Sequence, residues 1–260
     1  MNAARQAEAA GGPIAAARQA VRRAPDQPAP LFLLCRLLLG ARDPEAATLL
    51  PRLEAFPAYA PGWHALGGTL LAAGSGEAAR VAFQRAVTAA PGVAESRLGL
   101  AAALLSLGRA GEAAALLARA EADLPHVAAL PYHRGVCLRE AGDAPAAHAA
   151  LLRAVALDPG MARAWFALGL TRQDLSDHDG AADAYRAALA AQPDLHEAAL
   201  NLGVALQEAR HMDAALDAYA AAYRLYPPAF GRIAQAMVTA PAGRLWLDPD
   251  ALRAVLAGRP

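Results

Sequence analysis

The chain has 260 residues, of which 56% are apolar and only 5% are aromatic, and its 24 Lys and Arg residues are balanced by 24 Asp and Glu residues. A composition dominated by Ala and Leu favours helices. A formal net charge of zero provides no long-range field that would attract nucleic acid or an anionic membrane, so we expect neither as a partner.

The N-terminal segment 1–25 lacks an apolar core of the signal-peptide type, because its arginines are interleaved with alanines. The most apolar run, 31–40, is too short to span a bilayer and contains Arg36. We therefore expect a cytoplasmic protein without a membrane segment. Segment 1–25 itself is predicted to form a degenerate helical hairpin or cap that is split at Gly11, Gly12 and Pro13.

Equally spaced prolines organise the next part of the chain. A proline fixes φ and lacks a backbone N–H, so equally spaced prolines predict equally spaced helix ends. The step from each to the next is constant in the series Pro57, Pro91, Pro125, Pro159, Pro193 and Pro227, and Pro25 precedes Pro57 by a slightly shorter step. The spacing predicts six repeats, 26–59, 60–93, 94–127, 128–161, 162–195 and 196–229.

Each repeat is predicted to be a pair of helices, because a second break falls between its halves. One such break is Asp43-Pro44, which is typical of an N-cap followed by proline at the first helical position. Pro28 and Pro30 predict a shortened first helix in repeat 26–59. Cys35 and Cys137 both fall at position 10 and lie three repeats apart, too far for a disulfide in a linear stack, so we expect small packing residues.

Other residues recur at fixed positions in these repeats. Small residues at positions 8, 20 and 27 allow two helices to approach closely, and a large residue at position 24 fills the space beside that contact. The recurring residues are Trp63 and Trp165 at position 4; Leu66, Leu100, Leu168 and Leu202 at position 7; Gly67, Gly135, Gly169 and Gly203 at position 8; and Phe83, Leu117, Leu151, Tyr185 and Tyr219 at position 24.

This pattern resembles the tetratricopeptide repeat family over 26–229, and agreement of several columns in six consecutive units makes coincidence implausible. The resemblance implies an all-α fold, a right-handed superhelical solenoid of antiparallel helix pairs. Such a stack spreads the chain over modules that contact only their neighbours.

The periodicity stops after Pro227. Segment 229–240 predicts one more first helix with Phe230, Ile233 and Met237 on one face, and Asp248-Pro249 predicts the start of a short amphipathic helix. Because end repeats must cover an exposed apolar face, 230–260 is predicted to be a set of capping helices. The alternative is that Trp246 and Leu247 belong to a docking element for a partner or for the chain's own groove.

The sequence contains no recognisable catalytic constellation. Its seven histidines show no metalloprotease spacing, and the run Asp177-His178-Asp179-Gly180 has Leu175 and Arg186 where a calcium loop needs ligands. We therefore predict no cofactor, no metal and no enzyme activity.

The family resemblance also implies where a partner binds, since first helices line the concave groove in this family. To the residues at these groove positions we add Asn201, whose side chain can hydrogen-bond to a partner. For the leucines, the alternative is that they pack between neighbouring hairpins and do not face a partner. The residues carried over are Leu34, Leu38, His64, Leu71, Leu98, Leu105, Tyr132, Val136, Arg139, Arg163, Phe166, Leu170, Gln173, Asn201, Val204 and Gln207.

The predicted function is that of a protein–protein interaction scaffold or adaptor that holds a peptide segment or partner protein in this groove. Two alternatives are open: either the chain is a non-catalytic targeting subunit of a protein-modifying enzyme, or it associates with itself as a structural homo-oligomer.

Overall fold

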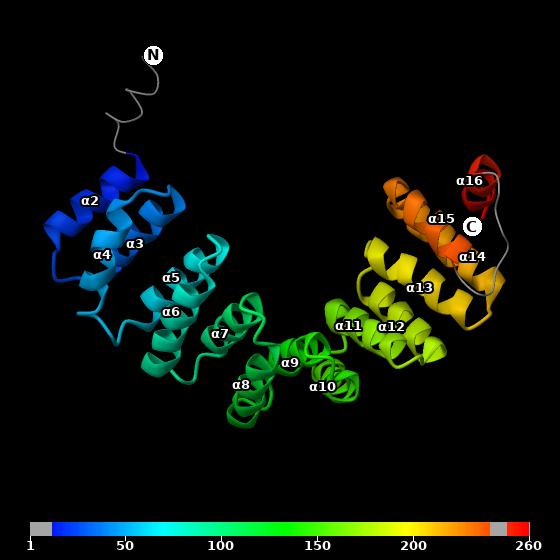
Figure 1. Cartoon of the computed structure of the whole chain (residues 1–260), viewed down its shortest axis with the longest axis horizontal. Helices are drawn as coiled ribbons and strands as arrows, with labels where there is room; N and C mark the ends of the chain where they lie inside the picture. Colours follow the sequence, from blue (N-terminus) through cyan, green and yellow to red (C-terminus); the bar gives the residue numbers. More distant parts are fainter. Residues whose placement is uncertain (1–11, 240–248, 260) are drawn as a thin grey trace, which may run out of the picture. The chain divides into compact units, whose positions relative to one another are not determined.

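The computed structural model describes residues 12–239 and 249–259, and within them it contains fifteen α-helices, one 3₁₀ turn and no strand. The chain divides into two units, Met1–Pro125 and His126–Pro260. In each unit, the two helices of each pair pack side by side (Figure 1). The prediction of an all-α solenoid of antiparallel helix pairs is confirmed.

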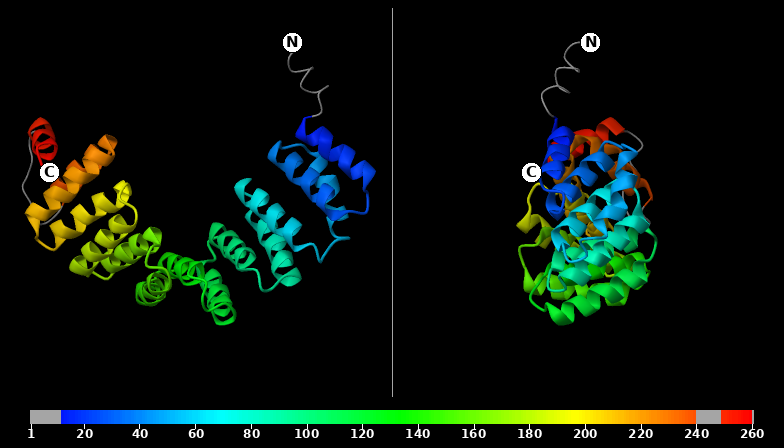
Figure 2. Two further views of the ribbon diagram at one scale, coloured as in Figure 1. Left: turned by 180° about the vertical axis from the view of Figure 1, so that it is seen from behind. Right: turned by 90° about the vertical axis from the view of Figure 1, so that its left-hand side faces the viewer.

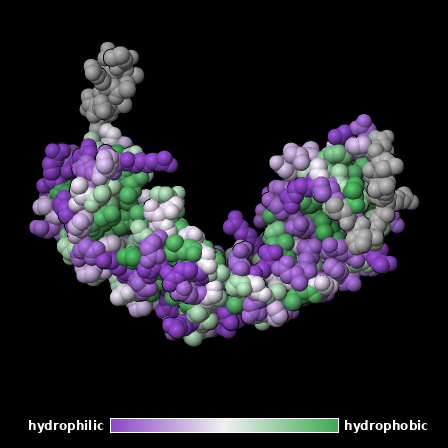
Figure 3. All heavy atoms as spheres, viewed as in Figure 1, coloured by the Kyte–Doolittle hydropathy of each residue, from purple (hydrophilic) through white to green (hydrophobic). Residues whose placement is uncertain are grey.

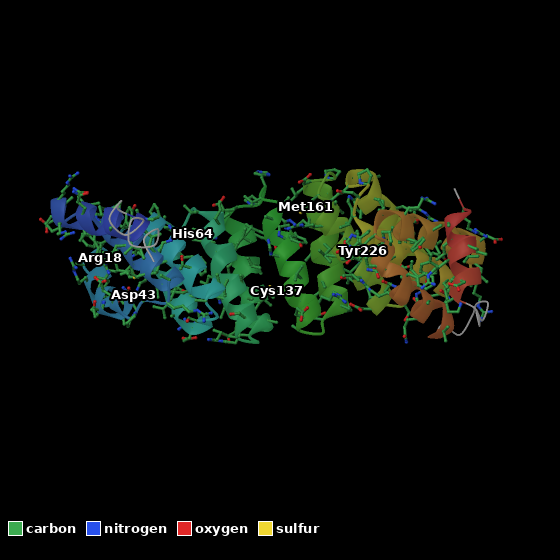
Figure 4. All side chains as sticks on the ribbon, turned by 90° about the horizontal axis from the view of Figure 1, so that it is seen from above. Arg18, Asp43, His64, Cys137, Met161 and Tyr226 are labelled. Carbon is green, nitrogen blue, oxygen red and sulfur yellow. The ribbon has the colours of Figure 1, made fainter. Side chains whose placement is uncertain are left out.

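The N-terminal unit contains one single helix followed by three pairs. The helices are α2 (Pro13–Arg23), α3 (Pro28–Gly40), α4 (Glu45–Leu53), α5 (Ala60–Ala72), α6 (Gly76–Ala89), α7 (Ala94–Ser106) and α8 (Ala110–Asp123). The other half of the predicted N-terminal hairpin, 1–11, lies outside the described residues. Arg18 of α2 forms an ion pair with Glu45 at the start of α4, close to Asp43 (Figure 4).

The C-terminal unit contains three pairs and two further helices. They are α9 (Ala129–Glu140), α10 (Ala144–Leu157), α11 (Ala162–Asp174), α12 (His178–Ala191), α13 (His196–Glu208), α14 (Met212–Leu225), the 3₁₀ turn η1 (Pro227–Ala229), α15 (Phe230–Thr239) and α16 (Pro249–Ala257). Figure 2 shows α16, in red, beside the orange helices that precede it.

The helices end where the prolines predict. The second helices α6, α8, α10, α12 and α14 all have the same length of 14 residues. Each of them ends two residues before a proline. Most of the first helices are followed by a residue with positive φ. In some repeats this residue is a glycine, such as Gly142 (φ 83°), and in others it is a larger residue, such as Ser176 (φ 60°) or Arg210 (φ 66°).

Aspartates then cap the helices that follow two of these turns. Asp143 accepts a hydrogen bond from Ala146 N–H, and Asp177 accepts one from Gly180 N–H. Each bond satisfies a backbone donor that has no partner inside the helix. The capping geometry thus sets these hairpin turns.

The two helices of a pair meet through a glycine and a large side chain. A Cβ atom at Gly67 would lie 2.9 Å from the Phe83 ring, and one at Gly169 would lie 2.5 Å from Tyr185 Cε1. Tyr185 and Tyr219 have no exposed surface. Positions 8 and 24 therefore form the helix contact that the sequence predicted, because only glycine leaves room for the ring.

The first repeat has a different register from the one that the sequence suggested. Helix α3 begins at Pro28 and α5 at Ala60, whereas α7 begins at Ala94, so the first step is two residues shorter than the second. Leu34 and Leu38 therefore occupy the positions of Leu66 and Leu70, which are buried in α5.

Three predictions for this repeat are wrong as a result. Leu34 and Leu38 are not groove residues but core residues, 3% and 0% exposed, in a helix that packs against α2, α4 and α5. Cys35 aligns with the glycine of position 8, not with Cys137. The first helix is not shortened: α3 has 13 residues because Pro28 and Pro30 lie in its first turn, where N–H groups have no partner in the helix. It is the second helix, α4, that is short, with 9 residues.

Helices α15 and α16 cover the end of the C-terminal unit. Ile233, Met237, Leu252 and Leu256 are all buried in its last core cluster. Arg259, just beyond α16, donates hydrogen bonds to Asp217 at 2.6 Å and to the Asp213 carbonyl at 2.9 Å, both on α14. Trp246 and Leu247 lie outside the described residues.

In the described part of the chain, no helix combines the length and the apolar character that crossing a bilayer would require.

Candidate functional site

A pocket of about 490 Å³ lies between first helices of the C-terminal unit. Helices α9 and α11 form its walls, and the beginning of α13 closes one side. It brings together six of the residues predicted to face the groove, Tyr132, Val136, Arg139, Arg163, Phe166 and Leu170. The remaining lining residues are Leu151, Ala167, Leu195 and Glu197. We call this the α9/α11 pocket.

The floor of the α9/α11 pocket is formed by Leu151 at position 24, a fully buried side chain. In the next two repeats the same position holds Tyr185 and Tyr219. Leucine lacks the outer ring atoms and the hydroxyl of tyrosine, so a hollow remains above it. The pocket thus lies at the hairpin whose position 24 is smaller than in the two that follow.

The longer tyrosines need an acceptor, and the chain provides one at position 12. The Tyr185 hydroxyl donates to Gln173 Oε1 at 2.5 Å, and the Tyr219 hydroxyl donates to Gln207 Oε1 at 2.7 Å. Burial raises the pKa of both phenols well above the usual value. The two glutamine side chains therefore accept hydrogen bonds from buried hydroxyl groups, and these carbonyl oxygens are not presented to a partner protein.

The charged residues that line the α9/α11 pocket are Arg139, Arg163 and Glu197. Arg139 Nε donates to Asp174 Oδ2 at 2.5 Å, so this guanidinium is already paired. Arg163 is exposed, and it makes no hydrogen bond or ion pair with any residue in 12–239 or 249–259. Glu197 has the His196 Nδ1 atom 3.3 Å from its Oε2. Arg163 is the cation of this pocket that can accept a new anionic partner.

A second pocket of about 370 Å³ lies between α13 and α15, and we call it the α13/α15 pocket. It contains Asn201 and Val204, two more residues of the predicted groove, together with Arg232 of α15. Among the described residues, none hydrogen-bonds to the side chains of Asn201 or Arg232. Figure 3 shows hydrophilic and apolar surface alternating over this unit on the face in view.

The predicted groove residues of the N-terminal unit do not join these pockets. His64, Leu71, Leu98 and Leu105 are half-buried. The His64 ring (labelled in Figure 4) lies 5.5 Å from the Phe83 ring centroid, and its Nδ1 lies 3.3 Å from Ser96 Oγ. A pocket of about 310 Å³ in this unit is lined by residues of α6, α7 and α8, among them Arg80, Leu104 and Arg119, and by none of these predicted groove residues.

The prediction of a groove position is also wrong for Gln207. Gln207 is 1% exposed, because its side chain is turned inward to Tyr219, so no partner can contact it. Gln173 is partly exposed, but its carbonyl oxygen is occupied by Tyr185. The pairing of tyrosine at position 24 with glutamine at position 12 was visible in both repeats of the sequence and could have identified this role.

Sequence reasoning also missed residues that line the pockets. Leu151 was regarded as a packing residue, Ala167 and Leu195 were given no role, and Arg232 was expected only in a capping helix. The signal for Leu151 was its size relative to the tyrosines that follow it at the same position.

The described residues contain no group of three or more His, Cys, Asp or Glu side chains that could hold a metal ion. Asp177 caps α12. Burial raises the pKa of the Cys35 and Cys137 thiols to about 11, which keeps both protonated at neutral pH.

Comparison with family sequence models decides the family. A tetratricopeptide repeat model matches 132–194 and again 166–230, and a second tetratricopeptide repeat model matches 70–130. The chain belongs to the tetratricopeptide repeat family. This membership supports a role as a protein-interaction scaffold with protein partners. A comparison with curated protein sequences finds no match.

Solved structures with the same fold include three tetratricopeptide-like chains. MamA is 25% identical, with a TM-score of 0.57, and the match covers 62% of this chain and 95% of MamA. TTC0263 of Thermus thermophilus is 26% identical, with a TM-score of 0.53, covering 69% and 99%. YrrB, described as a TPR protein with an unusual peptide-binding site, is 21% identical, with a TM-score of 0.53, covering 70% and 95%. The last likeness concerns the fold alone.

Proposed function

We propose that the chain acts by binding and that it holds a segment of a partner protein in the α9/α11 pocket. The observation that carries this proposal is the convergence of six predicted groove residues on one hollow with an apolar floor. A volume of about 490 Å³ is in the range of ligand pockets in proteins. Its combination of Tyr132, Phe166 and a free Arg163 corresponds to the residue types that dominate binding energy at interfaces.

The mechanism is burial of one apolar side chain of the partner. This side chain fills the space above Leu151, between Phe166 and Leu170, where water is displaced from apolar surface. The pocket walls are helices held by their own core contacts, so little ordering is required on binding. An adaptor and a targeting subunit would both bind a partner in this way, and the two roles differ only in the identity of the partner protein.

The test uses peptides recovered from a random display library selected on the full chain. Fluorescence anisotropy then measures the affinity of a recovered peptide for the wild type, for Leu170→Ala and for Phe166→Ala. We expect both variants to weaken binding about tenfold or more, which is typical of residues at the centre of an interface.

The matched control is Leu152→Ala, which truncates an exposed leucine of α10 that does not line the pocket. It should leave the affinity unchanged. Circular dichroism checks that each variant is folded. Equal affinity for all four proteins, or failure to recover any peptide, would overturn the proposal. Recovery of a dimer that Leu170→Ala disrupts would show that a second copy occupies the pocket.

A further inference from the structure

The two pockets of the C-terminal unit adjoin each other across α13. The α9/α11 pocket reaches Leu195 and Glu197 at the start of this helix. The α13/α15 pocket is lined by Leu200, Asn201 and Val204, beginning one turn further along it. Both are open at the surface, so an extended segment that occupies the first pocket can continue into the second and leave at its far side.

Among the lining residues of this path, two arginines without described partners outnumber the one carboxylate, Glu197, that lacks a permanent counter-charge. Arg163 stands in the first pocket and Arg232 in the second; both are exposed and pair with no described residue. Of the carboxylates close to the path, Asp174 pairs with Arg139, whereas Glu197 has only the His196 Nδ1 atom 3.3 Å from its Oε2, a contact that is an ion pair only when the histidine is protonated. A ligand carboxylate would therefore find two guanidinium groups without partners, whereas a ligand cation would find only one carboxylate, Glu197, without a permanent counter-charge.

A single terminal carboxylate cannot satisfy both arginines, because they belong to different pockets on either side of α13. Two side-chain carboxylates on one strand can. The apolar floor at Leu151 additionally requires an apolar side chain between or beside them. The chemistry of the two pockets thus describes an internal segment of a protein, acidic at two places and apolar at one.

We propose that the segment bound by this protein is internal and acidic, with carboxylates that pair with Arg163 and Arg232 and an apolar side chain in the α9/α11 pocket. This inference rests on the proposed function, because it specifies the partner of the same site. Arg163 and Arg232 act as specificity-determining residues, while Phe166 and Leu170 supply burial.

The experiment is a selection from a random peptide library displayed with protein on both sides of each peptide, so that every candidate is internal. The full chain is the target in its wild-type form, as the double variant Arg163→Gln/Arg232→Gln, and as the matched control Arg22→Gln/Arg23→Gln. The control removes two exposed arginines without described partners from α2 in the other unit.

Peptides selected on the wild type and on the control should be enriched in Asp and Glu at two positions relative to the unselected library. The double variant should lose this enrichment while the apolar position persists. For the best wild-type peptide, the double variant should weaken binding by about three- to thirtyfold, as expected for two solvent-exposed pairs, and added salt should weaken wild-type binding in the same direction.

The outcomes separate this inference from the proposed function. The selected peptides could share an apolar position without acidic enrichment, or with basic enrichment. If their binding is then lost in Leu170→Ala but kept in the double variant, the acidic partner is overturned and the pocket is left as the binding site. Peptides that bind equally to wild type, Leu170→Ala and the double variant overturn both. A dimer broken by Leu170→Ala assigns the pocket to a second copy and overturns the acidic segment.

Discussion

The phenolic hydroxyl of Tyr219 donates a 2.7 Å hydrogen bond to Gln207 Oε1, joining α14 to α13 inside the hairpin. Tyr185 and Gln173 repeat this bond in the preceding hairpin. Where position 24 is Phe83 or Leu151, which have no hydroxyl, position 12 holds Leu71 or Arg139 instead. The two positions therefore change together, because a buried hydroxyl without an acceptor is unfavourable.

Replacing Gln207 by leucine should leave the Tyr219 hydroxyl buried without this acceptor. We expect the free energy of unfolding of the C-terminal unit to fall by about 1–3 kcal/mol. Urea unfolding followed by circular dichroism measures the change. The double variant Gln207→Leu/Tyr219→Phe removes both partners and should recover most of the loss; if it is less stable than Gln207→Leu alone, the hydrogen bond is not what the glutamine provides.

The same two tyrosines predict instability at alkaline pH. Burial raises the pKa of Tyr185 and Tyr219 above the ordinary value of 10.0, so the folded chain holds these protons more tightly than the unfolded chain does. Their contribution to stability is complete below about pH 10 and is lost as the pH rises further. Urea midpoints measured from pH 8 to 11 should fall above pH 10, and they should fall less steeply in Tyr185→Phe/Tyr219→Phe. Identical slopes for the two proteins would contradict this.

Two adjacent glycines in α5 provide a matched pair of substitutions. A Cβ at Gly67 would meet the Phe83 ring at 2.9 Å, whereas a Cβ at Gly68 would meet nothing within 4 Å. Gly67→Ala should destabilise the N-terminal unit by about 1–3 kcal/mol through overpacking. Gly68→Ala should stabilise it by about 0.5–1 kcal/mol, because alanine has the higher helix propensity. Thermal unfolding of both variants measures the two opposite signs, and a shift of the same sign in both would refute the packing argument.

The terminal helix α16 should be required for the stability of the pair before it. Leu256 is 0% exposed in the core that α16 shares with α14 and α15, and Leu256→Ala should cost about 2–5 kcal/mol locally. Leu225→Ala, which truncates a leucine that is 44% exposed at the end of α14, is the matched control and should have little effect. Amide hydrogen exchange should accelerate in α14 and α15 only in the first variant; unchanged protection there would mean that α16 does not cover them.

Much of the fold could be predicted because its determinants are local. The regularly spaced prolines and the positive-φ residues lie just beyond helix ends, and a glycine facing a ring marks where two helices meet, so the helix pairs followed from spacing. The first repeat was misaligned because one register was imposed on all repeats, although the shorter interval from Pro25 to Pro57 had already indicated a repeat that was two residues shorter. Leu34 and Leu38 were placed on the surface for that reason.

The candidate site was less predictable because its pocket depends on which side chains fill the space between hairpins. Family positions indicated the first helices, and Tyr132, Arg139, Arg163 and Phe166 of these helices line one pocket. They did not indicate that Gln207 would turn inward, nor that Leu151 would form a floor. Those features depend on the sizes and hydrogen-bonding needs of side chains in the second helices, which a list of groove positions leaves out.

The place of Leu151 has a consequence for how such arrays evolve. The same position in the following two hairpins holds a buried tyrosine, so we expect that exchanging a large for a small residue there changes the volume of the pocket while the helix pair keeps its length. Gene duplication can therefore lengthen the array with filled modules, while point mutation elsewhere opens or seals cavities. The number of modules and the number of pockets can therefore change independently of each other during evolution.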